Sequence, residues 1–258
     1  MTNRQGTPVW YELMTRNPDA AQVFYGSVLD WHFLKTPGGP QADYRIASAG
    51  ADTVAGLLPM PGHAEGMPDM WFIYVGVNDV DAVAERVKML GGTIEMQPTD
   101  IPGIGRFAFC CDPQGAYFYL MRGDSDQNSR AFSPDTPGHC SWNELVTTDQ
   151  TAALGFYREL FGWEHGCAMA MGDAGDYTFI NHQGAMIGAM MDLPQSGAQP
   201  FWNFAFTVSD IDRAKSAVET GGGQVRLGPI QLPGDGGWLI QATDPNGAKI
   251  MFTGRRNH

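Results

Sequence analysis

The segment at residues 10–31, WYELMTRNPDAAQVFYGSVLDW, recurs at residues 142–163 as WNELVTTDQTAALGFYRELFGW. The two copies lie 132 residues apart and share two tryptophans, a glutamate, a leucine and a Phe-Tyr pair in one register. Because tryptophan and tyrosine are rare, such a match indicates an internal repeat, and a repeat has to be recognised before the fold is predicted. The chain is therefore interpreted as two homologous halves.

The repeat extends to the ends of both halves. A shift of 131 residues pairs Trp71 with Trp202 and the glycines 91–92 with 222–223, and a shift of 132 pairs DPQG at 112–115 with DPNG at 244–247. The segment between the halves is polar and rich in turn formers, without apolar periodicity, which is typical of a linker. We expect one domain at residues 1–122, a linker at 123–137 and a second domain at 138–258.

Each half contains one order of elements twice. In the first half, residues 9–15 alternate as in a strand, and Asn17 followed by Pro18 predicts a helix start. Strands are expected at 44–47 and 53–58. The second unit begins with a strand at 71–77. A helix follows, capped by Asn78 or Asp79 and ended by the glycine pair. Further strands are expected at 93–96, 106–111 and 116–121.

This order of elements, the Phe-Tyr pair in the first helix and the DPxG turn together resemble the vicinal-oxygen-chelate superfamily. That superfamily contains glyoxalase I, bleomycin-resistance proteins and extradiol dioxygenases. The WxEL start is shared with two-domain glyoxalase-like proteins labelled as hydroxylases or lyases. The resemblance predicts an α+β fold of four βαβββ units, which form two tandem glyoxalase-like domains with curved mixed sheets around a groove.

Strand alternation assigns the two faces of each expected strand. Ile73, Val75 and Val77 share one face, as do Phe118 and Leu120, and these apolar rows suit the side beneath the helices. The opposite faces then line the groove. The predicted ligand-binding residues on those faces are Trp10, Glu12, Phe72, Tyr74, Tyr117, Tyr119, Trp142, Glu144, Asn203 and Met251.

Metal enzymes of the resembling family take His, Gln or Glu ligands from the first and last strands of their units. Carried onto this sequence, those positions hold Trp10, Phe72, Trp142, Asn203, Tyr119 and Met251, with further positions near Gly56 and Gly188. Tryptophan, phenylalanine, glycine and methionine side chains offer no ligand to a hard divalent cation. We therefore expect no metal site and no cofactor.

Glu12 and Glu144 are the carboxylates of the predicted groove faces. A carboxylate walled by aromatic rings has a raised pKa and can act as a general base near neutral pH, which makes both residues catalytic candidates. The alternatives are contact with a ligand, or a structural role in which each carboxylate pairs with an arginine or caps a backbone amide.

Composition excludes several classes of function. The net charge is −12 with only 16 Lys and Arg, which argues against nucleic acid because such binding depends on neutralising phosphates. No apolar stretch reaches the roughly 18 residues of a membrane span, and the first twenty residues do not resemble a secretory signal. The four cysteines form no CxxC pair and are expected to be free thiols. A cytoplasmic monomer or homodimer is expected.

Three functions remain open on the sequence. The leading hypothesis is a metal-free protein that binds or sequesters a small molecule in aromatic-lined grooves. The second is a glyoxalase- or dioxygenase-type enzyme, a lyase or oxidoreductase acting on a small metabolite. The third is an interaction module whose own tryptophans fill the grooves.

Overall fold

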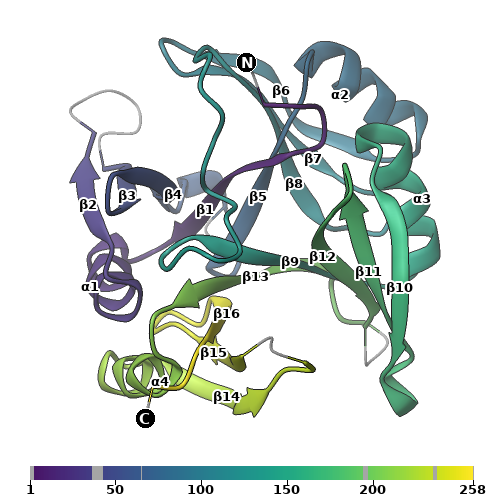
Figure 1. Ribbon diagram of the computed structural model, residues 1–258. Coiled ribbons are helices and arrows are strands. Elements are labelled where there is room, and N and C mark those ends of the chain that lie inside the picture. Colours follow the sequence, from purple (N-terminus) through teal and green to yellow (C-terminus); the bar gives the residue numbers. More distant parts are fainter. Residues whose placement is uncertain (1–2, 37–42, 65, 194–196, 235–236, 258) are drawn as a thin grey trace. The chain divides into compact units, whose positions relative to one another are not determined.

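The computed structural model describes residues 3–36, 43–64, 66–193, 197–234 and 237–257 (Figure 1). The described residues form two eight-stranded sheets and four α-helices, which confirms the predicted α+β class. The first half contributes β1 (Pro8–Thr15), α1 (Pro18–Leu29), β2 (His32–Lys35), β3 (Arg45–Ala49), β4 (Asp52–Pro59), β5 (Met70–Gly76), α2 (Val80–Met89), β6 (Thr93–Ile101), β7 (Gly105–Cys111) and β8 (Tyr117–Gly123). The order of strands in its sheet is β2-β3-β4-β1-β5-β8-β7-β6.

The second half repeats this arrangement element by element. It contributes β9 (Cys140–Thr147), α3 (Gln150–Phe161), β10 (Glu164–Ala170), β11 (Asp176–His182), β12 (Ala185–Asp192), β13 (Phe201–Val208), α4 (Ile211–Thr220), β14 (Gln224–Gln231), β15 (Trp238–Thr243) and β16 (Lys249–Gly254). Its sheet has the order β10-β11-β12-β9-β13-β16-β15-β14. Both sheets are mixed, because β1 pairs with β4 and β5 with β8 in parallel while the hairpins are antiparallel.

The predicted helix starts are confirmed. Asn17 precedes α1 and accepts a hydrogen bond from the Ala20 amide through its side chain, and Asp79 does the same for α2 with Ala82. Such capping satisfies one of the backbone donors that every helix leaves unpaired at its first turn.

The strand expected at 93–96 was predicted too short. β6 continues to Ile101 through Pro98 and the polar residues that follow it, because it pairs with β7 along its length. It is the last strand of its sheet, where a proline is tolerated since no neighbour requires its missing amide hydrogen.

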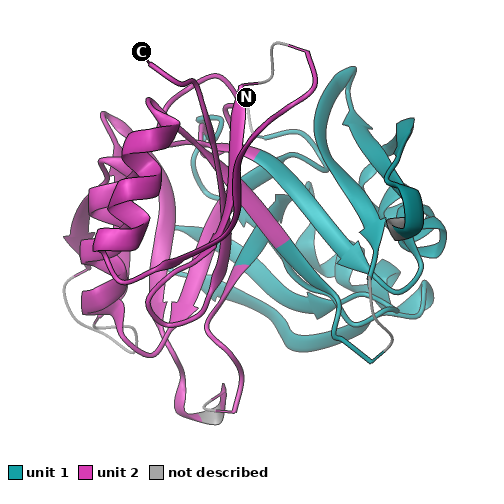
Figure 2. Cartoon of the chain, turned by 90° about the horizontal axis from the view of Figure 1, so that it is seen from below, with its two compact units in different colours: residues 1–9, 72–129, 142–202 teal, residues 10–71, 130–141, 203–258 magenta. Residues whose placement is uncertain are grey.

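Contacts divide the chain into two compact units that do not follow the two halves (Figure 2). Unit 1 contains residues 1–9, 72–129 and 142–202, and unit 2 contains residues 10–71, 130–141 and 203–258. In unit 1 helix α2 packs with α3, and in unit 2 helix α1 packs with α4. The domain boundaries expected from the repeat remain a prediction, and each unit takes one βαβββ module from each half.

The residues that revealed the repeat form the core of each unit. In unit 2 the Trp71 indole donates to the Tyr25 hydroxyl (3.0 Å), which donates to Asp244 (3.2 Å), while Asp244 also accepts from the Ala248 amide of its turn. In unit 1 Tyr157 donates to Asp112 (3.0 Å). Trp31 and Trp163 are buried, as expected for packing residues.

The glycine pairs have a packing role besides ending helices. Gly91 and Gly222 have positive φ, as the helix ends require. A Cβ on Gly223 would lie 2.7 Å from the Phe24 ring, so the ring of α1 packs directly on the backbone after α4.

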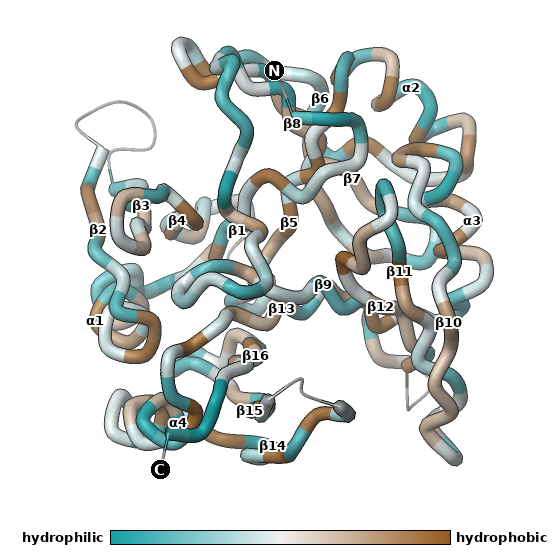
Figure 3. The backbone as a smooth tube through the Cα atoms, in the orientation of Figure 1, coloured by the Kyte–Doolittle hydropathy of each residue, from teal (hydrophilic) through white to brown (hydrophobic). Residues whose placement is uncertain are grey.

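No helix in the described part of the chain is long and apolar enough to span a membrane. Along the tube in Figure 3, hydrophobic and hydrophilic residues alternate within the elements and form no long apolar run. The four cysteines are free, as predicted. The expected location and oligomeric state stay predictions.

Candidate functional site

Unit 1 carries a continuous group of aromatic side chains on one face of three neighbouring strands. We call this group the aromatic ladder; its members are Phe72 and Tyr74 on β5, Phe107 and Phe109 on β7, and Tyr117 and Tyr119 on β8. Four of these residues, Phe72, Tyr74, Tyr117 and Tyr119, belong to the set predicted from strand alternation. Their gathering follows from the pairing of β5 with β8 and of β8 with β7.

The rings of the ladder stack in sequence across the strands. Tyr74 and Tyr119 have centroids 4.2 Å apart at an interplanar angle of 9°. Tyr119 then stacks on Phe109 at 4.4 Å, and Phe109 on Tyr117 at 5.3 Å. Offset or parallel contacts at these distances contribute to stability beyond the burial of area. The stack therefore holds its rings in a fixed orientation.

Burial changes along the ladder. Tyr74 and Tyr119 are buried, whereas Phe109 and Tyr117 are only partly covered. Burial, and then the nearby Cys111 and Glu95, raise the pKa of Tyr117, so its hydroxyl stays protonated at neutral pH. The face of β8 opposite the ladder is apolar, and there Phe118 packs on the aromatic rings of α3. The ladder thus has a rigid buried end and an accessible aromatic end.

The third module of the chain, β9–β12, holds a second polar and aromatic cluster in unit 1. The Trp142 indole donates to the Tyr177 hydroxyl (2.8 Å), and this hydroxyl donates to the Glu144 carboxylate (2.8 Å). Glu144 is 7% exposed. Burial and the Glu144 charge hold the pKa of Tyr177 well above its ordinary value, so the tyrosine acts as a donor.

The Tyr177 hydroxyl is thus one partner of Glu144, and the structural role considered for this carboxylate stays a prediction. The first half has a related arrangement in unit 2, where the Trp10 indole donates to the Tyr44 hydroxyl (2.9 Å). Glu12 is buried on the same strand, opposite Gly56 of β4. The catalytic role considered for both glutamates stays a prediction.

The remaining predicted residues, Asn203 and Met251, are buried in unit 2, which also contains buried Glu12 and the partly exposed Trp10. Met251 pairs with Ala205 across β16 and β13. Burial lowers the pKa of Lys249 on the same strand. Asn203 and Met251 thus stand in the second half where the first half has the rings of Phe72 and Tyr119.

Sequence reasoning missed Phe107, Phe109, Tyr44 and Tyr177. The first two lie at alternate positions of a strand that was predicted but whose faces were not assigned. Tyr44 and Tyr177 recur 133 residues apart, one residue out of the register used to find the repeat. Both signals were present in the sequence.

The donor groups do not fit the metal that the fold implies. The positions carried over from the resemblance hold rings, a thioether, an amide and glycines. Over the described ranges, no three His, Cys, Asp or Glu side chains gather so as to hold an ion. Hard divalent cations require several oxygen or imidazole ligands, and these positions do not supply such a set.

Comparison with known proteins assigns the family. Residues 7–120 and 136–252 match the Glyoxalase/Bleomycin resistance protein/Dioxygenase superfamily, and the chain belongs to this superfamily. It is 35% identical over 247 residues to "Putative glyoxylase CFP32" of Mycobacterium tuberculosis, covering 95% of this chain and 93% of the relative. It is 31% identical to "Anthracycline biosynthesis protein DauV" of Streptomyces sp. strain C5, covering 94% and 91%.

Solved structures share the fold at low sequence identity. The Mn(II)-bound glyoxalase from Novosphingobium aromaticivorans matches with a TM-score of 0.67 and 17% identity, covering all of this chain and 84% of that one. The 2,2',3-trihydroxybiphenyl 1,2-dioxygenase from Sphingomonas wittichii RW1 matches with a TM-score of 0.69 and 16% identity, covering 98% and 91%. These matches establish the fold alone.

Proposed function

We propose that this protein binds a flat aromatic small molecule, without a metal, against the accessible end of the aromatic ladder. The observation that carries the proposal is the stack that runs from buried Tyr74 to partly exposed Tyr117. A ligand ring placed on Tyr117, the last ring of the series, extends a stack that is already ordered. Binding then requires little loss of side-chain freedom from the protein.

The surroundings of the ladder suit an apolar ligand of variable shape. Exposed Met96 on β6 pairs with Phe109 on β7, and methionine adapts to irregular surfaces through its flexible thioether. A relative named for anthracycline biosynthesis supports the same ligand class, because anthracyclines contain a flat polycyclic aromatic core. Binding or sequestering such a molecule is the function that these features favour.

The test uses 1,8-dihydroxyanthraquinone, a flat neutral tricycle, titrated into the purified protein by calorimetry. Replacing Tyr117 with Leu removes the accessible ring but keeps an apolar side chain, and we expect affinity to fall by about tenfold, within the range of aromatic stacking energies. Replacing Phe109 with Leu interrupts the stack and should weaken binding at least as much.

The matched control is Leu227→Ala, which removes an exposed apolar side chain on β14 that is not a member of the ladder. This variant should bind the tricycle as the wild type does. Equal affinity of wild type and Tyr117→Leu, in a variant with unchanged melting temperature, would rule out the ladder as the binding site.

A second candidate is a lyase- or oxidoreductase-type enzyme, favoured by the mycobacterial relative named as a glyoxylase and by the buried Glu144–Tyr177 pair. Its test is mass spectrometry of the bound tricycle after incubation, with and without added Mn(II), Zn(II), Ni(II) or Fe(II). An altered mass that depends on the ion, together with a thermal shift reversed by a chelator, would favour the enzyme. Unchanged ligand and no shift would favour the binding protein.

A further inference from the structure

Three aromatic rings lie together in the third module, and one of them stands nearly perpendicular to the other two. We call them the ring cage; they are Trp142 on β9 and Tyr177 and Phe179 on β11. The centroids of Trp142 and Phe179 are 5.9 Å apart at 80°, and those of Tyr177 and Phe179 are 5.7 Å apart at 86°. Phe179 thus makes edge-type contacts with both partners, whereas Tyr74, Tyr119, Phe109 and Tyr117 of the ladder are stacked.

Hydrogen bonds hold the Trp142 and Tyr177 rings of the cage in place and affect the charge distribution of the rings. Trp142 donates to Tyr177, and Tyr177 donates to Glu144. Donation from the phenol to a carboxylate increases electron density in the tyrosine ring. The rings therefore present negative faces beside a buried carboxylate.

The strand register places the carboxylate under the rings. Glu144 pairs with Ala189 on β12, and Ala189 pairs with Phe179 on β11. These three residues lie on one face of the sheet, and the small Ala189 side chain, itself fully buried, separates the carboxylate from the phenylalanine. Met169 pairs with Tyr177 at the next row.

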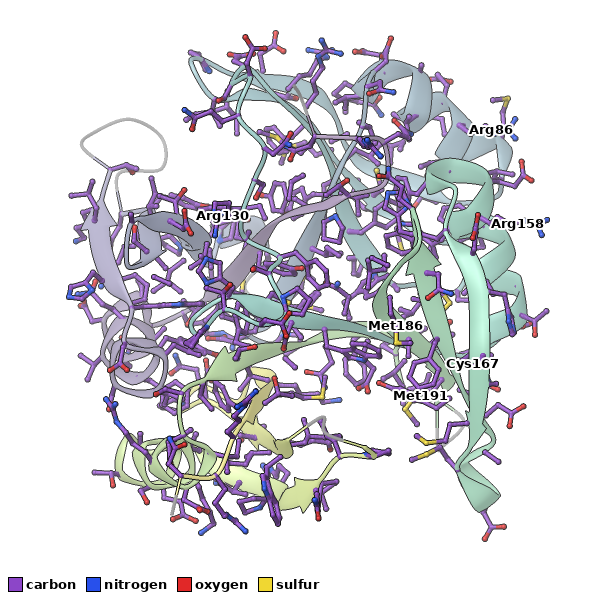
Figure 4. All side chains as sticks on the ribbon, viewed as in Figure 1. Arg86, Arg130, Arg158, Cys167, Met186 and Met191 are labelled. Atoms are coloured by element: carbon purple, nitrogen blue, oxygen red, sulfur yellow. The ribbon has the colours of Figure 1, made fainter. Side chains whose placement is uncertain are left out.

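Flexible sulfur-containing side chains border this region. Figure 4 labels Met186 and Met191 on β12 and Cys167 on β10, the two strands that flank β11 in the sheet. Methionine side chains adjust to ligands of different size. All three residues of the cage are of intermediate exposure, so the cage lies at the boundary between the core and solvent.

We propose that the ring cage and Glu144 form a binding site for an organic ammonium group. Electron-rich rings attract a cation over their faces, and alkylated ammonium ions are recognised in this way because they have no strong donors to satisfy. The carboxylate adds charge complementarity in a poorly solvated place. The inference does not depend on the ladder's ligand, since it rests on other residues.

The first half supplies an internal comparison. Trp10 and Tyr44 keep the hydrogen bond between the first two rings, but the residue corresponding to Phe179 is Ile46. Gly56 stands opposite both Glu12 and Ile46, and a Cβ there would collide with the Tyr44 hydroxyl. In unit 2 the tyrosine thus occupies the space over the glycine, and only two rings remain. The cage is complete in the second half.

The experiment compares choline with 3,3-dimethylbutan-1-ol, a neutral molecule of nearly the same shape, by NMR titration of the full-length protein. We expect choline to bind at least about tenfold more tightly, because only the cation gains from the ring faces and the carboxylate. Equal binding of the two molecules would overturn the proposal, since it would indicate an ordinary apolar site.

Variants locate the site. Phe179→Ile copies the first half, and it should weaken choline binding roughly threefold to thirtyfold, the range of cation–π contacts from exposed to desolvated sites. Glu144→Gln should weaken choline but leave the neutral alcohol unchanged. Ile46→Val and Tyr117→Leu are controls that should not change choline affinity.

Loss of choline binding in Tyr117→Leu, with Phe179→Ile unaffected, would place the cation at the ladder and overturn the proposal. Melting temperatures of all variants verify that each is folded. Failure of the tricycle to bind would refute the proposed function alone, because choline binding is measured separately.

Discussion

Tyr25 and Tyr157 each sit at the centre of a core assembled from both halves of the chain. Tyr25 of the first half donates to Asp244 of the second, and Tyr157 of the second half donates to Asp112 of the first. Asp112 accepts three backbone amides of its own turn through its other oxygen. Burial raises the pKa of both aspartates, although these hydrogen bonds oppose the shift. The repeated Phe-Tyr and DPxG motifs therefore have a structural role.

Replacing Tyr25 with Phe should destabilise the protein by about 1–3 kcal/mol, the usual range for leaving a buried polar group unsatisfied. The change removes the hydroxyl that accepts from the Trp71 indole and donates to Asp244. Urea denaturation measures the free energy of unfolding. Tyr117→Phe, at a partly exposed tyrosine, is the control and should stay within about 0.5 kcal/mol of wild type. If Tyr25→Phe left the free energy of unfolding unchanged, the hydrogen bonds of Tyr25 would not contribute to stability.

At the scale of elements, the end of β11 is covered by the N-terminal segment in unit 1. A Cβ on Gly6 would lie 3.0 Å from the His182 ring, and the Gly6 carbonyl accepts from the Trp163 indole (2.8 Å). Gln5 donates to the carbonyl of Leu160 at the end of α3. Burial lowers the pKa of His182 below its ordinary value, even though nearby backbone carbonyls and Glu164 favour the charged ring.

The lowered pKa of His182 predicts a loss of stability in acid. In the unfolded chain His182 becomes protonated near pH 6.5, whereas in the folded protein it becomes protonated only at a lower pH. The contribution of His182 is therefore present above pH 6.5 and is lost as the pH falls below that value towards the folded pKa. Urea denaturation at pH 7.5 and pH 5.5 should show a smaller decrease in His182→Gln than in wild type. His165→Gln, at an exposed histidine of β10, should behave as wild type, and equal decreases in all three proteins would contradict the prediction.

Local patterns predicted the elements well where a chemical signal marks their ends. Asn17, Asp79 and the glycine pairs defined helix boundaries, because capping and positive φ depend on neighbouring residues in the sequence. The end of β6 was missed because that strand is maintained by pairing with β7, through a stretch that contains Pro98 and Asp100, which have low strand propensity. The site was predicted in part, since alternation identifies a face but not which rings touch.

At the scale of the whole molecule, each compact unit needs residues from both halves. Unit 1 joins residues 72–129 to residues 142–202, and unit 2 joins residues 10–71 to residues 203–258. A half of the chain on its own therefore contains parts of two units and neither unit complete. Its buried rings would lose their partners, as Phe24 would lose the backbone at Gly223.

Separate expression tests this arrangement. Fragments 1–131 and 132–258 should each either unfold or self-associate when alone, because the apolar surfaces of α1 and α2 or of α3 and α4 are uncovered. Mixing the two should restore a cooperative thermal transition, measured by circular dichroism with mass determination by light scattering. A monomeric fragment that melts cooperatively near the temperature of the full chain would contradict the prediction.

The sequence by itself determined the duplication, the order of elements, the helix caps, the superfamily and the apolar and aromatic faces of the strands. The superfamily follows from resemblance to known proteins, and the other features follow from local spacing or from the comparison of one half with the other. Only the tertiary structure decided which half completes which core. The two glycine pairs are equivalent in sequence, and so are the two DPxG turns. The sequence pattern therefore permits the Phe-Tyr pair of α1 to pack against either copy. Packing selects the second copies for α1, because Phe24 and Tyr25 contact Gly223 and Asp244.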